Sequence, residues 1–244
     1  DLTMSLRAAT DHWRDIGRLS DLQTAQMIRS DRIDILVDLS GHTLGNRLLV
    51  FSARSAPVQV SWLGYFGTTG LGTMDYLIGD HFVTPETSSC EFVESIWRMP
   101  DSYLCFSVPN IDISVRPPPS QGGAPFTFGC FSNLAKVSSE TISIWASVLN
   151  ELPNARLLLK AKGLDDPDVR QRILDQVASR NVWPGRIIFE TASPRQDYLS
   201  AYHRVDAILD TTPFSGGTTT AEALWMGVPV ITLRGQTWAG RICE

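Results

Sequence analysis

The sequence lacks several features that would place it in common functional classes. No apolar run approaches the roughly 20 residues that a transmembrane helix needs, and the polar first residues are not a secretory signal. Lysine and arginine do not cluster in any segment, and the formal net charge is −5, which argues against a nucleic-acid-binding surface. We therefore expect a cytoplasmic protein in which a few polar or basic groups at one site bind a negatively charged ligand.

Cysteine is scarce, and some familiar motifs are missing. Cys90, Cys105, Cys130 and Cys243 show none of the paired spacings of a zinc site or a redox motif, so we interpret them as small buried residues in a reducing compartment. No Gly-x-Gly-x-x-Gly follows a strand, and no phosphate-binding loop carries a Gly-Lys pair. These absences disfavour dehydrogenases and P-loop kinases. A repeat of the tetratricopeptide period is not found either.

The length and composition predict two globular domains. The 244 residues are 43% hydrophobic and 19% charged, as in ordinary globular proteins, and the length exceeds that of a usual single core. The Pro- and Gly-rich residues 107–125 fit neither a helix nor a central strand, so we expect a linker there. This predicts one lobe at 1–106 and another at 126–244. Since the chain does not start with methionine and stops where a further helix begins, we expect a piece of a longer protein in which both lobes are incomplete.

Both lobes show alternating strand and helix patterns. Residues 33–39 are rich in β-branched side chains, which favours a buried parallel strand, and residues 21–29 predict a helix that Ser20 caps. The other expected strands are 58–63, 74–78, 95–99, 126–131, 155–160, 186–190, 205–209 and 228–233. The other expected helices are 47–53, 139–151, 168–178, 195–203 and one that begins at 218. The alternation predicts two parallel Rossmann-like α/β lobes with ligand groups at the carboxyl ends of the strands.

The most informative segment is residues 205–222, which predicts a strand, a Pro/Gly loop and a helix opened by three threonines. Gly216 and Gly217 allow the backbone to approach an anion closely. Thr218, Thr219 and Thr220 offer donors at a helix N-terminus, where the dipole favours negative charge; a simple helix start is the alternative reading. Glu222 is placed to accept ribose hydroxyls, or else stabilises the helix dipole as a solvated carboxylate. The segment predicts a site for a nucleoside diphosphate.

Other polar residues follow predicted strands. Lys136 lies beyond the first strand of the second lobe, where a fixed positive charge could face a phosphate, although a solvated lysine has the same pattern. Lys160 ends its strand and is a second basic candidate. The segment Asp166-Pro167-Asp168 imitates a metal-binding Asp-x-Asp motif, but the periodic residues that follow predict a helix start. We predict no metal.

Several separate motifs resemble one family of glycosyltransferases. In the second lobe they are residues 129–136, residues 214–222, which we call the glycine–threonine loop, and residues 224–232; in the first they are residues 34–43, 56–65 and 67–70. In this order they resemble the catalytic region of the protein O-GlcNAc transferase and SPINDLY family over nearly the whole chain.

The resemblance implies an inverting, metal-independent transferase of the GT-B fold that moves a sugar from a nucleotide donor to Ser or Thr hydroxyls of proteins. It implies no cofactor, a donor in the second lobe, an acceptor peptide between the lobes, and tetratricopeptide repeats in the full-length protein. Lys136 is similar to the lysine that relatives use at the phosphates. Asn133, Arg195 and Tyr198 are similar to donor-binding positions. On the first lobe, His42 is the second catalytic candidate, and the acceptor side would include Thr43, Gly64, Tyr65, Thr68 and Thr69.

The pattern departs from animal O-GlcNAc transferases at three positions. Those enzymes have histidines at the positions of Tyr198 and Gly217 and an aspartate at that of Glu222. Here Gly217, Glu222 and Lys160 are more similar to SPINDLY and bacterial members. This leaves two donors, UDP-GlcNAc and GDP-fucose, the second of which SPINDLY proteins use. An enzyme like the nucleotide-sugar epimerases and an inactive scaffold are the remaining alternatives.

Overall fold

A computed structural model describes residues 2–244, without the side chains of Ser89 and Cys90. The chain divides into two compact units, the first ending at Tyr103 and the second spanning Leu104–Glu244. Each contains its own parallel sheet with strands and helices in alternation, so the predicted pair of α/β lobes is confirmed. Among residues 2–244, no helix combines the length and the hydrophobicity that crossing a bilayer requires.

The first unit is built on a four-stranded parallel sheet in the order β1-β2-β3-β4. Its strands are β1 (Ile35–Asp38), β2 (Val58–Ser61), β3 (Tyr76–Asp80) and β4 (Ser95–Met99). Its helices are α1 (Leu2–Ala8), α2 (Asp21–Ser30), α3 (Leu48–Ser52) and the 3-10 helix η1 (Glu86–Glu91). Ser20 caps α2 as predicted, because its side chain accepts the backbone N–H of Gln23, whose own side chain returns to the Ser20 backbone.

The predicted burial of the first strand is wrong for one of its faces. Leu36 packs against the hydrophobic cluster of α2 and α3, whereas Ile35 is 60% and Val37 42% exposed. Along a strand, successive side chains point to opposite faces, and β1 lies at the edge of its sheet. A run of apolar residues therefore predicted the strand correctly but could not show that only one face is covered.

The second unit is a five-stranded parallel sheet in the order β7-β6-β5-β8-β9. The strands are β5 (Thr127–Cys130), β6 (Arg156–Lys160), β7 (Ile187–Glu190), β8 (Ala207–Leu209) and β9 (Val230–Ile231). The α-helices are α4 (Ser139–Glu151), α5 (Pro167–Ala178), α6 (Arg195–Ser200) and α7 (Thr218–Trp225). Short 3-10 helices are η2 (Pro119–Gly122), η3 (Leu134–Lys136), η4 (Pro184–Arg186), η5 (Ala201–Arg204) and η6 (Trp238–Gly240).

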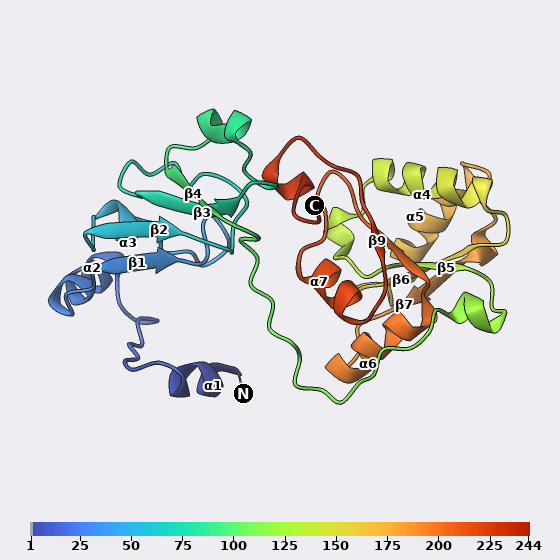
Figure 1. The fold of residues 1–244 in the computed structure, drawn as a ribbon, viewed down its shortest axis with the longest axis horizontal. Helices are drawn as coiled ribbons and strands as arrows, with labels where there is room; N and C mark the ends of the chain where they lie inside the picture. The colour runs from blue at the N-terminus through green and yellow to red at the C-terminus, as the bar shows by residue number, and fades with distance from the viewer. Residues whose placement is uncertain (1) are drawn as a thin grey trace. The chain divides into compact units, whose positions relative to one another are not determined.

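Helices cover both faces of the second sheet (Figure 1). Leu157 and Leu159 of β6 join a buried cluster with residues of α4 and α5, whereas Leu158 joins a second cluster with residues of α6, η5 and α7. The predicted start of α5 is confirmed, since the Asp166 side chain caps it by accepting the backbone N–H of Asp168 at 2.8 Å. Alternating burial thus fixes the register of the sheet that carries the glycine–threonine loop.

Residues 107–125, expected as a linker, pack along the second unit. Ile111 and Ile113 contact its second hydrophobic cluster, and the Ser114 carbonyl accepts a hydrogen bond from His203 Nε2 at 2.8 Å. The buried Asp206 carboxylate accepts the backbone N–H groups of Ser120 at 2.9 Å and Thr127 at 2.8 Å. The segment is therefore held by packing and by hydrogen bonds, although it contains little regular structure.

Candidate functional site

Two predicted motifs meet at the carboxyl edge of the second sheet. Lys136 follows β5, and the glycine–threonine loop follows β8, the strand beside β5. The Lys136 ammonium donates to the Ser215 carbonyl at 2.8 Å, across 79 residues of sequence. Its Nζ also lies 3.8 Å from the centre of the Phe214 ring, within the range of a cation–π contact. The structure thus places the candidate phosphate-binding lysine against the candidate phosphate cradle.

Asp210, which the sequence analysis did not select, organises this loop. Its Oδ1 accepts the N–H groups of Gly216 at 2.9 Å and Thr211 at 2.8 Å, and its Oδ2 accepts the Thr232 hydroxyl at 2.9 Å. The peptide that joins Ser215 to Gly216 therefore has its carbonyl on the Lys136 ammonium and its N–H on the Asp210 carboxylate. A polar residue directly after a buried strand was the sequence signal that could have identified Asp210.

The surroundings of Lys136 act on its pKa in opposite directions. Burial lowers the pKa of the ammonium group, while the negative charge of Asp210 and the nearby Cys130 raise it; the net result is a pKa below the usual value for lysine. Lys136 is half-buried rather than a solvated surface lysine.

The three threonines open α7, and Gly217 precedes the helix as its N-cap residue. Because glycine has no side chain, the cap itself supplies no acceptor for the first N–H groups of the helix. A Cβ placed on Gly216 would lie 2.6 Å from Thr220 Oγ1 and 2.9 Å from Thr219 Oγ1, so a larger residue at this position would displace these hydroxyls. The loop is compact, and the start of α7 remains available to an anion.

Glu222 and Arg195 form an ion pair with Oε1 and Nη1 2.6 Å apart. Glu222 is only 2% exposed, so the reading of a solvated carboxylate is wrong. Tyr198 lies beside the pair: burial is the main cause of its raised pKa, and the charge of Glu222 adds to the effect. Tyr202, four residues further on, donates its hydroxyl to the Thr219 carbonyl at 3.1 Å, which ties η5 to the helix that the threonines open.

Lys160 and Asn133 line a second part of this edge, a cavity of about 230 Å³ that also includes Ser193 and Tyr198. The Lys160 ammonium is buried and donates to Glu190 Oε2 at 3.3 Å and to the Thr191 carbonyl at 3.2 Å. The Asn133 side chain accepts the Ala135 N–H, as a turn-forming residue does, and Asn133 also lines this cavity.

The candidate residues of the first unit form a separate cluster. His42 Nε2 lies 3.0 Å from the Thr69 carbonyl, and because a carbonyl only accepts, this nitrogen carries the proton. The His42 ring meets the edge of Tyr65 with 5.2 Å between the ring centres. The buried Glu94, another residue that sequence reasoning missed, accepts the Thr68 hydroxyl and the Thr69 N–H, each at 2.7 Å.

Two further predicted acceptor-side residues support the same loops. The Thr43 hydroxyl donates to the Ser40 carbonyl at 2.8 Å. At Gly64 an added Cβ would lie 1.8 Å from the Leu39 carbonyl oxygen, so only glycine permits this approach of two backbone segments.

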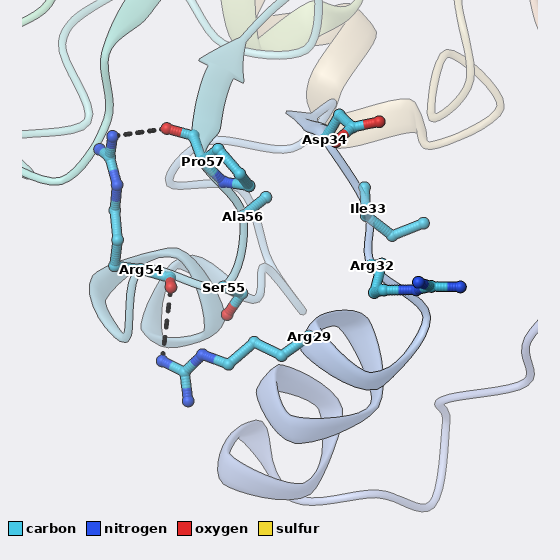
Figure 2. Close-up of a pocket in the computed structure, with 8 residues that line it drawn as sticks. All are labelled: Arg29, Arg32, Ile33, Asp34, Arg54, Ser55, Ala56 and Pro57. Atoms are coloured by element: carbon cyan, nitrogen blue, oxygen red, sulfur yellow. Dashed lines mark hydrogen bonds between the residues drawn. The ribbon is translucent and has the colours of Figure 1, made fainter.

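A larger cavity, of about 460 Å³, lies away from these residues (Figure 2). Residues that precede β1 and β2 line it, including Arg29, Arg32 and Arg54. Arg29 donates to the Ala53 carbonyl, and Arg54 donates to the Pro57 carbonyl at 2.7 Å. In a parallel α/β sheet, ligands bind at the carboxyl ends of the strands, so this cavity is at the wrong end for the predicted chemistry.

The cysteines are only partly as expected. Cys130 is buried, which raises the pKa of its thiol to about 12, and Cys243 is half-buried. Cys105 is exposed, so its predicted burial is wrong, and the side chain of Cys90 lies outside the described residues. In the part of the chain that the structure describes, no three His, Cys, Asp or Glu side chains gather as metal ligands would.

Comparison with known proteins gives a consistent result. The model of the family described as Glycosyl transferase family 41 matches residues 2–108 and 121–244. The chain is 39% identical over 231 residues to a protein from Oryza sativa subsp. japonica, named as a probable UDP-N-acetylglucosamine–peptide N-acetylglucosaminyltransferase SPINDLY. It is 32% identical over 246 residues to the corresponding probable enzyme SEC of Arabidopsis thaliana. These alignments cover 94% and 97% of this chain but 25% of each relative.

Two solved structures of O-GlcNAc transferases are also similar to this chain. A mutant O-GlcNAc transferase from Thermobaculum terrenum superposes with a TM-score of 0.94 and 43% identity, covering 99% of this chain and 46% of that one. A pneumococcal O-GlcNAc transferase in complex with UDP and GlcNAc superposes with a TM-score of 0.53 and 15% identity, covering 90% of this chain and 52% of that one. The second likeness shows the fold alone.

Proposed function

The chain belongs to glycosyl transferase family 41 and has its two-lobed GT-B fold, and from this premise we propose that it forms part of a protein O-glycosyltransferase. The reaction moves a sugar, GlcNAc from UDP-GlcNAc, onto Ser or Thr hydroxyls of proteins with inversion at the sugar carbon. Since the chain spans about a quarter of the curated relatives it matches, this activity is proposed for the protein to which the chain corresponds. We place that protein in the cytoplasm and expect tetratricopeptide repeats in its full-length form.

The observation that carries the proposal is the contact of Lys136 with the glycine–threonine loop. When the bond between sugar and diphosphate breaks, negative charge develops on the departing diphosphate, and a fixed positive charge lowers the barrier most when it is already in place. Lys136 supplies that charge beside a helix N-terminus that attracts anions. We infer that these groups make a metal unnecessary for leaving-group stabilisation.

Glu222 and Arg195 extend the site from the diphosphate toward the nucleoside. The buried Glu222 carboxylate is suited to accept ribose hydroxyls, because the Arg195 guanidinium holds it in place and because the carboxylate has few contacts with water to give up. Asn133, Lys160 and Tyr198 line the neighbouring cavity of about 230 Å³, which we assign to the donor as well. In the first unit, His42 and the loop bearing Thr68 and Thr69 are assigned to the acceptor side.

GDP-fucose is the second candidate donor. Gly217 and Glu222 differ from the histidine and aspartate of animal O-GlcNAc transferases, and the glutamate is the longer of the two carboxylate side chains and is held in an ion pair with Arg195. Because Glu222 is assigned to the nucleoside part of the donor, its difference from aspartate bears on the choice of nucleotide more than on the chemistry of transfer.

The test is to incubate the protein separately with UDP-GlcNAc, UDP-glucose and GDP-fucose, then measure thermal stabilisation and sugar transfer to protein. We expect UDP-GlcNAc to stabilise the fold and to label protein, and Lys136→Met to reduce transfer by about 100-fold or more, as removal of one charge-stabilising group commonly does. No stabilisation by any nucleotide sugar would refute the donor site. Full transfer by Lys136→Met would refute the role of the lysine, and a change confined to the free nucleotide sugar would favour an epimerase.

A further inference from the structure

The aromatic ring of Phe214 is the feature of this edge that the proposed function does not yet use. Phe214 is half-buried and belongs to the loop after β8, directly before the serine whose carbonyl accepts from Lys136. The Lys136 Nζ lies 3.8 Å from its ring centre, closer than the 5.8 Å and 5.6 Å by which Arg170 and Arg195 approach Phe189 and Tyr198. The ammonium is thus in direct contact with the face of the ring.

We propose that Phe214 is a positioning residue that holds the Lys136 ammonium charged and in place for the departing diphosphate. This inference rests on the proposed function for the identity of the anion, but the contact itself is a property of the ligand-free chain.

The geometry leaves the ammonium few alternatives. One N–H is used by the Ser215 carbonyl, and the ring occupies another side without consuming a hydrogen bond. A long, flexible lysine loses rotamer entropy when it binds a phosphate, and that cost is smaller if the side chain is already held. The ring therefore fixes the direction of Lys136 while it leaves donors for an incoming anion.

The loop that carries the ring is fixed in turn. The Gly216 N–H and the Thr211 N–H both donate to Asp210, at 2.9 and 2.8 Å, so the backbone on each side of Phe214 is bound to one carboxylate. The Thr211 hydroxyl donates to the Phe214 carbonyl at 2.6 Å. The backbone that carries the ring is therefore held in place beside Lys136.

Two physical roles for the ring predict opposite results. If Phe214 only excluded water, a smaller aliphatic residue would let water reach Lys136, and the pKa of the lysine would rise toward its usual value. If the face of the ring stabilises the cation, loss of the ring removes that stabilisation and the pKa falls. Phe214→Leu keeps an apolar side chain and removes the aromatic face, so the direction of the change identifies the role.

The first arm of the experiment needs no ligand. Lys136, Lys160 and Lys162 are the only lysines of the chain, so selective 13C labelling at lysine Cε gives three signals, of which Lys136→Arg identifies one. We expect Phe214→Leu to lower the pKa of Lys136 by about 0.5 or more, and Phe214→Tyr to leave it near that of the wild type. The matched control is Phe189→Leu, which removes the ring beneath Arg170 and should not change the Lys136 signal.

The second arm tests action through the lysine. UDP and GDP are titrated separately, and the one that binds is used to compare the single variants Phe214→Leu and Lys136→Met with the double variant. We expect Phe214→Leu alone to weaken binding about 3- to 10-fold, and to weaken it no further once Lys136 is methionine.

Each outcome decides one claim. An unchanged or raised pKa of Lys136 in Phe214→Leu, or an equal loss of affinity with and without the lysine, overturns the positioning role and leaves the transferase proposal intact. Failure of the wild type to bind either nucleotide overturns the donor site, while the ligand-free titration still decides the role of Phe214.

Discussion

At the scale of the residue, Arg195 and Glu222 form a pair with unequal exposure. The Glu222 side chain is 3% exposed and that of Arg195 47%, so loss of the arginine would leave a buried carboxylate without its counter-charge. Loss of the carboxylate charge would leave an arginine that water can reach.

We therefore predict that Arg195→Met destabilises the chain by about 2 kcal/mol and Glu222→Gln by less than about 1 kcal/mol. Denaturant unfolding at neutral pH measures both. The exposed pair between Arg14 and Asp31, 2.8 Å apart, serves as the control, and Arg14→Met should cost no more than about 0.5 kcal/mol. Equal costs for the two Arg195–Glu222 variants would show that burial does not govern this pair.

Single residues also show what the sequence can and cannot predict. The cap at Ser20 was predictable because it depends on neighbours within three residues. Asp210 was missed although two of its partners are near in sequence, since Thr211 follows it directly and Gly216 lies six residues on. Glu94 could not be selected in this way, because Thr68 and Thr69 reach it across 26 and 25 residues of sequence. Lys136 was predicted at the correct edge of the sheet, but its contact with the Phe214 ring depends on a partner far along the chain.

At the scale of the element, Glu190 links the ends of neighbouring strands and the following 3-10 helix. It ends β7, accepts Lys160 from the end of β6 at 3.3 Å, and accepts Arg204 Nη2 of η5 at 2.6 Å. The Arg204 hydrogen bonds are the main cause of a lowered pKa for this carboxyl, with Lys160 contributing less. Since the pKa is lower in the folded than in the unfolded chain, ionised Glu190 stabilises the fold.

The sign of that linkage gives a pH prediction. The contribution of Glu190 is present above its unfolded pKa and is lost as the pH falls through its folded pKa. Glu190→Gln should therefore be less stable than the wild type at pH 7, and the difference should shrink steadily in acid. Urea unfolding at several pH values measures it, with the exposed Glu151→Gln as a control expected to remain within about 0.5 kcal/mol. A difference that does not depend on pH would mean that charge plays no part.

The elements themselves were mostly predictable from periodicity and turn residues. The helix Ser139–Glu151 and the strand Ser95–Met99 have the predicted bounds. The helix Leu2–Ala8 was missed, since its large apolar residues recur at every second position rather than with the helical period and the structure buries none of its residues. The half-exposed face of β1 was missed because the covering of a strand is decided by other elements.

At the scale of the whole molecule, the segment before β5 should contribute to the stability of the second unit. Residues 111–120 supply two isoleucines to a hydrophobic cluster and one N–H group to the buried Asp206. We predict that residues 104–244 alone unfold at a temperature at least about 5 °C above that of residues 126–244. Thermal unfolding by circular dichroism measures this, and residues 109–244, which keep these contacts, should resemble the longer chain. Equal melting temperatures for 104–244 and 126–244 would contradict a stabilising role for the segment.

The half-buried Lys136 has a consequence for chemical probes. A lysine with a lowered pKa has a larger neutral, nucleophilic fraction near pH 7 than an ordinary lysine, and this chain offers only two competing lysines. Lys160 is 5% exposed and bound to Glu190, so Lys162 is the main competitor for an acylating reagent. Lys136, which we propose as the phosphate-binding group, is therefore the expected point of selective covalent attachment for an electrophile carried by a nucleoside.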